Sequence, residues 1–391
     1  MKRSSRISLL FLFAAIIMFD SCKKVDTAAI AFGKITGKIV SANNKASIKV
    51  ASVFTTVDGK LYVTQTDTDG AFTLEAPAGS RRVTIQTGDG SMFRTEIDVV
   101  VKEDVVTAIS AVPVKLNLVA NLAFIPGVYD KIENIVQDSL GYPMHVILWD
   151  NVKDMQFLTP YDAIFLNCTN QLEMQNFDSL TYAHLATYVA NGGSLYISDW
   201  AVKALIGQSL GPTTSCSVAR VGGFIPDSLL CVRQGGVQGS LLNNPIISSS
   251  LQAYLNKTSI DKVTYNLQQW EKVQTLDTNF WETMVASSTG NPLLIRTNLY
   301  TDPTKGTLTI GSTTANAGYS LVCVSGTGGQ HFTLSVRTSE VAGLLANGAT
   351  NGACNNSTGA GRIYFTTFHN EPNAHIGSDI KNILDYVILN L

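Results

Sequence analysis

Apolar and polar residues alternate in short stretches from residue 33 to about residue 112, with a turn signal between most stretches. Asp58-Gly59 and Asp69-Gly70 favour tight hairpin turns. The predicted strands are Lys34–Val40, Ile48–Thr55, Leu61–Thr66, Ala71–Glu75, Arg81–Gln86, Phe93–Val101 and Val105–Val112. Many short strands separated by regular turns predict an all-β sandwich, here over residues 33–116.

The pattern changes at residue 117, where apolar strands alternate with segments of helical periodicity. Strands are predicted at Leu122–Ile125, His145–Trp149, Tyr161–Cys168, Ser194–Ser198 and Ile363–Phe368, and helices at Val128–Leu140, Leu180–Val189 and Ile376–Leu391. This alternation predicts a parallel sheet with helices on both faces, a three-layer α/β domain. We assign it residues 117–210 and 361–391.

Residues 211–360 differ from both regions. They are rich in Gly, Ser, Thr and Asn, and residues 301–358 in particular favour hairpins. We interpret the stretch as a β-rich insertion into the α/β domain. The sequence therefore predicts a multidomain chain, an all-β sandwich followed by an interrupted α/β domain.

The N-terminus has the features of an export signal. Basic residues in Met1–Arg6 precede the apolar run Ile7–Phe19, which is too short to anchor in a bilayer. The residues Phe19-Asp20-Ser21-Cys22 resemble the lipobox of bacterial lipoproteins. The resemblance implies a signal peptide of residues 1–21, a lipid on Cys22 and a tether of residues 22–32, hence an outer-membrane lipoprotein that is periplasmic or surface-exposed. The alternative is an ordinary secreted protein in which Cys22 is incidental.

Cysteine content agrees with export, whereas the net charge says little. Lys and Arg total 28 against 30 Asp and Glu, so no basic surface for nucleic acid is expected. The remaining cysteines suit an oxidising compartment: Cys216 with Cys231 and Cys323 with Cys354 flank glycine-rich loops and are disulfide candidates, with connectivity left open. Cys168 lies in an apolar strand. The Cys and His spacing fits no zinc motif, so neither a metal nor a cofactor is predicted.

Two motifs in the first domain carry a family resemblance. Ile35-Thr36-Gly37-Lys38-Ile39-Val40 and the hairpin Thr66–Leu74 are similar to the carboxypeptidase regulatory-like domain. In that family the module is a non-catalytic spacer or docking unit, so the resemblance implies a structural or docking role for residues 33–116.

Candidate chemistry gathers at the strand ends of the α/β domain. Ligands of open α/β sheets bind beyond the carboxyl ends of the strands. There the last strand is followed by His369, Asn370 and Glu371, an imidazole and a carboxylate that suit general-base work. A His held by a loop hydrogen bond is the competing interpretation. The other strand ends supply Asn167, Asp199, Trp200, Tyr129 and Asp130.

The same strand ends resemble the class I glutamine amidotransferase-like superfamily, whose sheet is flavodoxin-like. Active members end a strand in Gln-Phe-His-Pro-Glu, and His369 and Glu371 fall on its base and orienting positions. Active members also carry a nucleophilic Cys between glycines on a sharp elbow. The segment Tyr196–Val202 has neither the Cys nor the glycines, so glutamine hydrolysis is not expected.

Three functions remain open from the sequence. The first is a non-catalytic envelope lipoprotein that binds a ligand or partner (a glycan, a peptide or an envelope protein) through Asn167, Trp200, Asn370, Tyr129 and Asp130. The second is an extracytoplasmic hydrolase that uses Asp199, His369 and Glu371 on a glycan or peptide. The third is a purely structural envelope scaffold.

Overall fold

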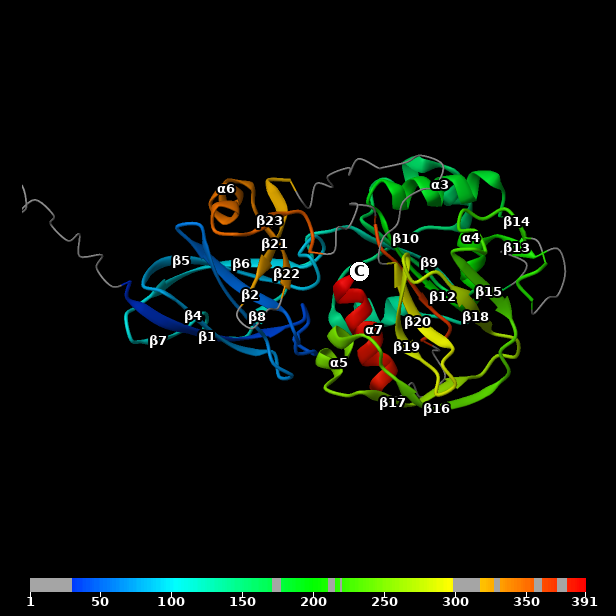
Figure 1. Cartoon of the computed structure of the whole chain (residues 1–391), viewed down its shortest axis with the longest axis horizontal. Helices are drawn as coiled ribbons and strands as arrows, with labels where there is room; N and C mark the ends of the chain where they lie inside the picture. Colours follow the sequence, from blue (N-terminus) through cyan, green and yellow to red (C-terminus); the bar gives the residue numbers. More distant parts are fainter. Residues whose placement is uncertain are drawn as a thin grey trace, which may run out of the picture.

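The computed structural model describes residues 30–170, 177–209, 215–218, 220–297, 317–326, 331–354, 361–370 and 378–391. It is a β-rich, multidomain chain in which a β-sandwich lies beside a larger unit built around a seven-stranded sheet (Figure 1). Within the described residues, no helix is both long and apolar enough to cross a membrane.

The first domain is a sandwich of two sheets, one fully antiparallel and one mixed. In one sheet β4 (Ala71–Pro77) and β7 (Val106–Ala108) flank β1 (Phe32–Val40), which also pairs with β8 (Val114–Lys115). The other sheet has the order β3 (Lys60–Gln65), β2 (Ser52–Val57), β5 (Gly79–Gln86) and β6 (Arg94–Val101). Alternate side chains such as Ile35, Leu74 and Ile85 are fully or almost fully buried between the sheets. The predicted sandwich is therefore present over this region, although β7 and β8 both run parallel to β1.

The seven-stranded sheet of the second domain is mainly parallel. Its order is β10 (His145–Val146), β9 (Leu122–Ile125), β11 (Ala163–Leu166), β12 (Ser194–Ser198), β24 (Ile363–Thr366), β20 (Pro292–Thr297) and β19 (Trp281–Ala286). The strands from β10 to β24 are parallel, whereas β20 and β19 add an antiparallel hairpin next to β24.

Each central strand divides its side chains between two cores. Phe124, Phe165 and Tyr364 join the core under α7 (Ser378–Asn390) and the π-helical turn η1 (Asn134–Leu140). Their neighbours along the strands pack instead against α3 (Ser179–Ala190), α4 (Lys203–Ile206) and η2 (Trp149–Lys153). A strand covered on both faces needs apolar residues throughout, which explains the unbroken apolar runs in the sequence.

The described parts of residues 211–360 contribute to several places. Short pairs form from β13 (Gln208–Ser209) with β14 (Arg220–Val221), β15 (Leu230–Gln234) with β18 (Glu271–Leu276), and β16 (Gly239–Pro245) with β17 (Ser259–Tyr265), while α5 (Ser249–Leu255) packs on α7. The hairpin β19–β20 completes the main sheet.

The last part of this stretch lies against the β-sandwich instead. The three strands β21 (Tyr319–Ser325), β22 (His331–Arg337) and β23 (Thr350–Asn351) and the helix α6 (Thr338–Ala346) sit beside β2, β5 and β6, drawn in orange next to blue in Figure 1. Their small core joins Leu334 and Leu344 to Phe54 of β2. Helix α6 corrects the expectation of hairpins throughout 301–358, because Val341 and Leu344 lie on one helical face over this core.

Candidate functional site

The candidate residues come from three neighbouring parallel strands. Strand β12 lies between β11 and β24, and all three end at the same edge of the sheet. Cys168 follows β11, Asp199 follows β12 directly, and His369 follows β24. Adjacent parallel strands bring these side chains together although up to 201 positions separate them in the chain, from 168 to 369.

Asp199 stands on a sharp turn from strand to helix. Its φ of 42° lies in the left-handed region, which non-glycine residues rarely adopt, and it opens the short 3₁₀ turn η4 (Asp199–Val202). Strained backbone of this kind is concentrated at functional positions, and Asp tolerates it better than most residues. The geometry is that of an elbow, with a carboxylate at its tip.

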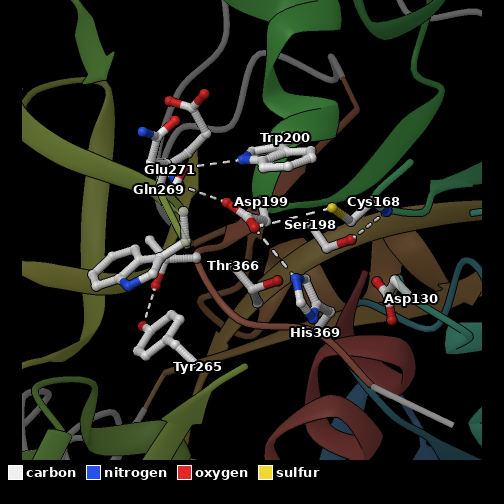
Figure 2. Close-up of polar contacts among 12 residues, drawn as sticks. Asp130, Cys168, Ser198, Asp199, Trp200, Tyr265, Gln269, Glu271, Thr366 and His369 are labelled. Atoms are coloured by element: carbon white, nitrogen blue, oxygen red, sulfur yellow. Dashed lines mark hydrogen bonds and ion pairs between the residues drawn. The ribbon is translucent and has the colours of Figure 1, made fainter. Parts of the chain in front are cut away.

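Both oxygens of the Asp199 carboxylate have partners within the protein. Its Oδ1 accepts a hydrogen bond of 2.6 Å from the Glu271 N–H. Its Oδ2 lies 3.2 Å from His369 Nε2 and 4.0 Å from Cys168 Sγ (Figure 2). Asp199 and Cys168 have no exposed surface, and His369 is 8% exposed. In this state the carboxylate serves to hold three loops together.

Burial sets the protonation of this cluster. It raises the pKa of Asp199, an effect that the hydrogen bond and charge of His369 oppose. Burial, together with the nearby charge of Asp199, raises the pKa of the Cys168 thiol to about 11, although His369 opposes the rise. Because only a thiolate is a good nucleophile, Cys168 as it stands is not an activated one at neutral pH.

Asp130 lies on the other side of His369 (Figure 2) and forms a second buried group with Asn370. Asp130 Oδ1 accepts hydrogen bonds of 2.8 Å from the N–H groups of Lys131 and Asn370. The Asn370 side chain donates to the Lys131 carbonyl at 2.6 Å. Burial raises the pKa of Asp130 to about 6, with His369 opposing the rise. These contacts join the loop after β9 to the loop after β24.

Asn167 has a similar joining role. Its side chain donates to Glu133 Oε2 at 2.8 Å and accepts from the Ile132 N–H at 3.3 Å. It is fully buried. Asn167 therefore supports the loop that carries Asp130 and presents no surface to a ligand.

Trp200 follows Asp199 directly and packs against Tyr129, and the two rings are the partly exposed aromatic groups beside the cluster. Both are half-buried, and their rings meet edge to face with centroids 5.7 Å apart and planes at 84°. The Trp200 Nε1–H donates to the Gln269 carbonyl at 3.1 Å, which fixes the indole. Lys203 Nζ lies 6.0 Å from the indole ring. We call Tyr129 and Trp200 together the aromatic rim.

Sequence reasoning missed the part played by Glu271. This buried residue of β18 donates its N–H to Asp199 and pairs through its side chain with Lys203, at 3.6 Å. Burial raises the pKa of Glu271 to about 7, and Lys203 opposes that rise. No sequence signal marks it, because β18 reaches the site through long-range strand pairing rather than through a motif.

Two predicted residues, Cys22 and Glu371, lie outside the described residues. The four disulfide candidates do form two bonds, Cys216–Cys231 with Cα atoms 6.1 Å apart and Cys323–Cys354 with Cα atoms 4.7 Å apart. Within the described part of the chain, Cys168 is the free cysteine.

Comparison with known proteins gives only slight likenesses. No protein-family model matches the chain, and no curated protein matches it. The solved structures that are similar to parts of it include a 5-hydroxyisourate hydrolase from Klebsiella pneumoniae, with 18% identity over 20% of this chain and 92% of that chain and a TM-score of 0.17. They also include a DUF3823 family protein from Parabacteroides merdae, with 16% identity over 23% of this chain and 48% of that chain and a TM-score of 0.18. A cohesin–X-dockerin complex from Acetivibrio cellulolyticus has 18% identity over 35% of this chain and 97% of that chain and a TM-score of 0.21. At such scores the likenesses assign no function.

Proposed function

We propose that this chain is an envelope lipoprotein whose α/β domain binds a glycan at the aromatic rim without cleaving it. The observation that carries the proposal is the state of Asp199. The residue at the tip of the elbow has no exposed surface, and both its oxygens are engaged by Glu271 and His369. A residue in that state does not attack a substrate.

The order of the sheet supports a retired amidotransferase-like domain. Numbered along the chain, the parallel strands β10, β9, β11, β12 and β24 have the order 2-1-3-4-5, which is that of flavodoxin-like sheets. In the amidotransferase-like superfamily that the sequence resembles, the nucleophile stands on an elbow of this kind. Here Asp199 holds the elbow and Cys168 is a buried thiol, so the nucleophile is absent from its position.

The aromatic rim favours a carbohydrate over other ligands. Partly exposed Trp and Tyr rings offer apolar faces with polar edges, which suit the mixed surface of a sugar ring. The indole is held by Gln269, so little rotamer freedom is lost on binding. Exposed amide side chains nearby, Gln268 and Gln269, can hydrogen-bond to sugar hydroxyls.

Affinity electrophoresis in gels containing soluble polysaccharides tests this proposal. At least one polysaccharide is expected to retard the protein, and Trp200→Ala should weaken the apparent affinity about tenfold, as the loss of one stacking contact predicts. Phe157→Ala is the matched control, because Phe157 is 49% exposed and precedes β11 at the opposite edge of the sheet. Equal migration of wild type and Trp200→Ala in every gel would contradict the proposal.

The second candidate function, a hydrolase, has one observation in its favour. Asp199 and His369 are hydrogen-bonded at a strained elbow, and a carboxylate and an imidazole in contact can activate water. This function requires Asp199 to become exposed, which would need the Trp200 and Glu271 contacts above it to open.

A further inference from the structure

Cys168, Asp199 and His369 form a compact cluster of metal-ligating side chains. One ligand atom from each lies within 4.8 Å of the other two, and all three residues are buried. The measured pairs are 3.2 Å between His369 Nε2 and Asp199 Oδ2 and 4.0 Å between Cys168 Sγ and the same oxygen. Among the residues that the structure describes, this is the only group of three His, Cys, Asp or Glu side chains placed closely enough to hold a metal ion.

These separations suit one small cation. Zinc binds His nitrogen and carboxylate oxygen at about 2.0–2.2 Å and thiolate sulfur at about 2.3 Å, so tetrahedral ligands lie roughly 3.3–3.7 Å apart. Side-chain shifts of about 1 Å would bring all three atoms to that spacing. Sulfur, imidazole and carboxylate together favour a borderline cation such as Zn²⁺ over Mg²⁺ or Ca²⁺.

We propose that Cys168, Asp199 and His369 bind one Zn²⁺ ion, a site that goes beyond the glycan binding proposed above. The cation would displace the thiol proton, and His369 would bind through Nε2 as a neutral imidazole. Asp199 would use Oδ2, because Oδ1 already accepts the Glu271 N–H.

Asp130 gives independent support. This carboxylate is completely buried on the far side of His369, and its Oδ2 has no partner of full hydrogen-bond geometry among the described residues, although the Ser198 hydroxyl lies near the carboxylate. Metal-binding imidazoles commonly have a carboxylate beside the ring, which orients it and increases its basicity. A bound cation would also offset part of the cost of burying a carboxylate on each side of His369.

The ion would link the ends of three strands. Cys168, Asp199 and His369 follow β11, β12 and β24, and the Tyr129 N–H donates to the Cys168 carbonyl at 3.1 Å. A bound ion would therefore make the loops that carry the aromatic rim more rigid. We assign it a structural role, since Trp200 and Glu271 cover Asp199 (Figure 2).

Cobalt titration of the purified protein, first stripped with a chelator, tests the site. Co²⁺ is expected to bind with a stoichiometry of one and to show the intense near-ultraviolet band of a thiolate–cobalt bond together with the visible bands of a tetrahedral site. Zn²⁺ should displace it. Cys168→Ser should abolish the thiolate band, and Asp199→Asn and His369→Gln should each weaken binding roughly 100-fold.

Controls separate the site from surface binding and from misfolding. His331→Gln, on the exposed end of β22, should bind Co²⁺ like the wild type. Should a buried variant fail to fold, the wild type alone decides, because Zn²⁺ must raise its melting temperature. The proposal is overturned if the wild type shows no thiolate band and no zinc-dependent stabilisation, or if Cys168→Ser keeps full affinity. Polysaccharide binding by the metal-free protein is measured separately, so either proposal can fail alone.

Discussion

At the scale of single residues, the interpretation of the α/β domain depends on Asp199. The backbone of Asp199 has a conformation that favours glycine. Its two carboxylate oxygens contact the Glu271 N–H and His369 Nε2. Burying this carboxylate destabilises the fold unless both partners are in place. A buried polar group without its partner costs about 1–3 kcal/mol of folding free energy, and a buried charge costs more.

Replacing Asp199 tests that dependence. Asp199→Ala leaves the Glu271 N–H and His369 without their acceptor, so the free energy of unfolding should fall by about 3 kcal/mol in urea denaturation with a chelator present. Asp98→Ala, whose side chain is 72% exposed, should change it by less than about 1 kcal/mol. Similar values for the two variants would show that the Asp199 contacts contribute little.

Part of this site was predictable from the sequence and part was not. Buried strands followed by polar residues predict that Asp199 and His369 approach each other, because carboxyl ends of adjacent parallel strands share an edge. The involvement of Cys168 and Glu271 was not predictable. A thiol at the end of an apolar strand looks like core, and β18 meets Asp199 through pairing that no local pattern encodes.

At the scale of elements, an ion pair and a hydrogen bond to Glu96 hold the β21–β23 sheet to the sandwich. Glu96 of β6 accepts hydrogen bonds from Arg337 and, at 2.8 Å, from the Tyr319 hydroxyl, and Arg82 lies 3.9 Å away. Burial raises the pKa of Glu96, but the Arg337 and Tyr319 hydrogen bonds outweigh it, so the pKa lies below the usual 4.5.

This shift predicts an acid-sensitive contact. A carboxyl with a lowered pKa binds fewer protons in the folded state, so its stabilisation is complete above about pH 4.5 and is lost as the pH falls through the folded-state value. Glu96→Gln should lower the unfolding free energy by about 1–2 kcal/mol at pH 7 and by less at pH 3. A difference that does not change between these pH values would contradict the assignment. Urea denaturation at both pH values measures it.

The loop after β9 fits tightly against β11. A Cβ at Gly127 would lie 2.3 Å from the Cys168 carbonyl oxygen and 2.6 Å from Asn167 Cβ. Gly127→Ala should therefore lower the unfolding free energy by about 2 kcal/mol and displace Tyr129, weakening polysaccharide retention. Val128→Ala, at a side chain 50% exposed, serves as the control. A stable Gly127→Ala protein with normal retention would show that the loop can move without consequence.

The strands of residues 211–360 show that a sequence pattern does not specify which strands pair. Residues 211–360 were expected to form one β-rich insertion, and the division of their strands between the main sheet and the sandwich depends on long-range pairing. Alternation predicts a strand but not its partner. The pairing of the parallel strands was easier to predict, since a helix between two parallel strands restricts how the chain can connect them.

At the scale of the whole molecule, the sandwich and the α/β domain share a core. Phe93 packs on Tyr142 with ring centroids 4.9 Å apart, and the Tyr142 hydroxyl donates to the Leu116 carbonyl at 2.9 Å. The apolar cluster that holds these residues extends to α7. The sandwich therefore supports the α/β domain directly through this shared core.

Membrane attachment is the prediction that belongs to the complete chain. Cys22→Ser removes the thiol that the lipobox resemblance implies is acylated. The variant should move from the membrane fraction to the soluble fraction after cell lysis, while Cys168→Ser should stay with the membranes. Sedimentation of Cys22→Ser with the membranes would contradict the lipoprotein assignment.

The most direct test of binding without cleavage is to follow a retained polysaccharide over time in the presence of the wild type and of Asp199→Asn. We expect chromatography to recover it at unchanged chain length from both. Shortening by the wild type that is lost in Asp199→Asn would contradict the account and establish Asp199 as a catalytic residue of a hydrolase.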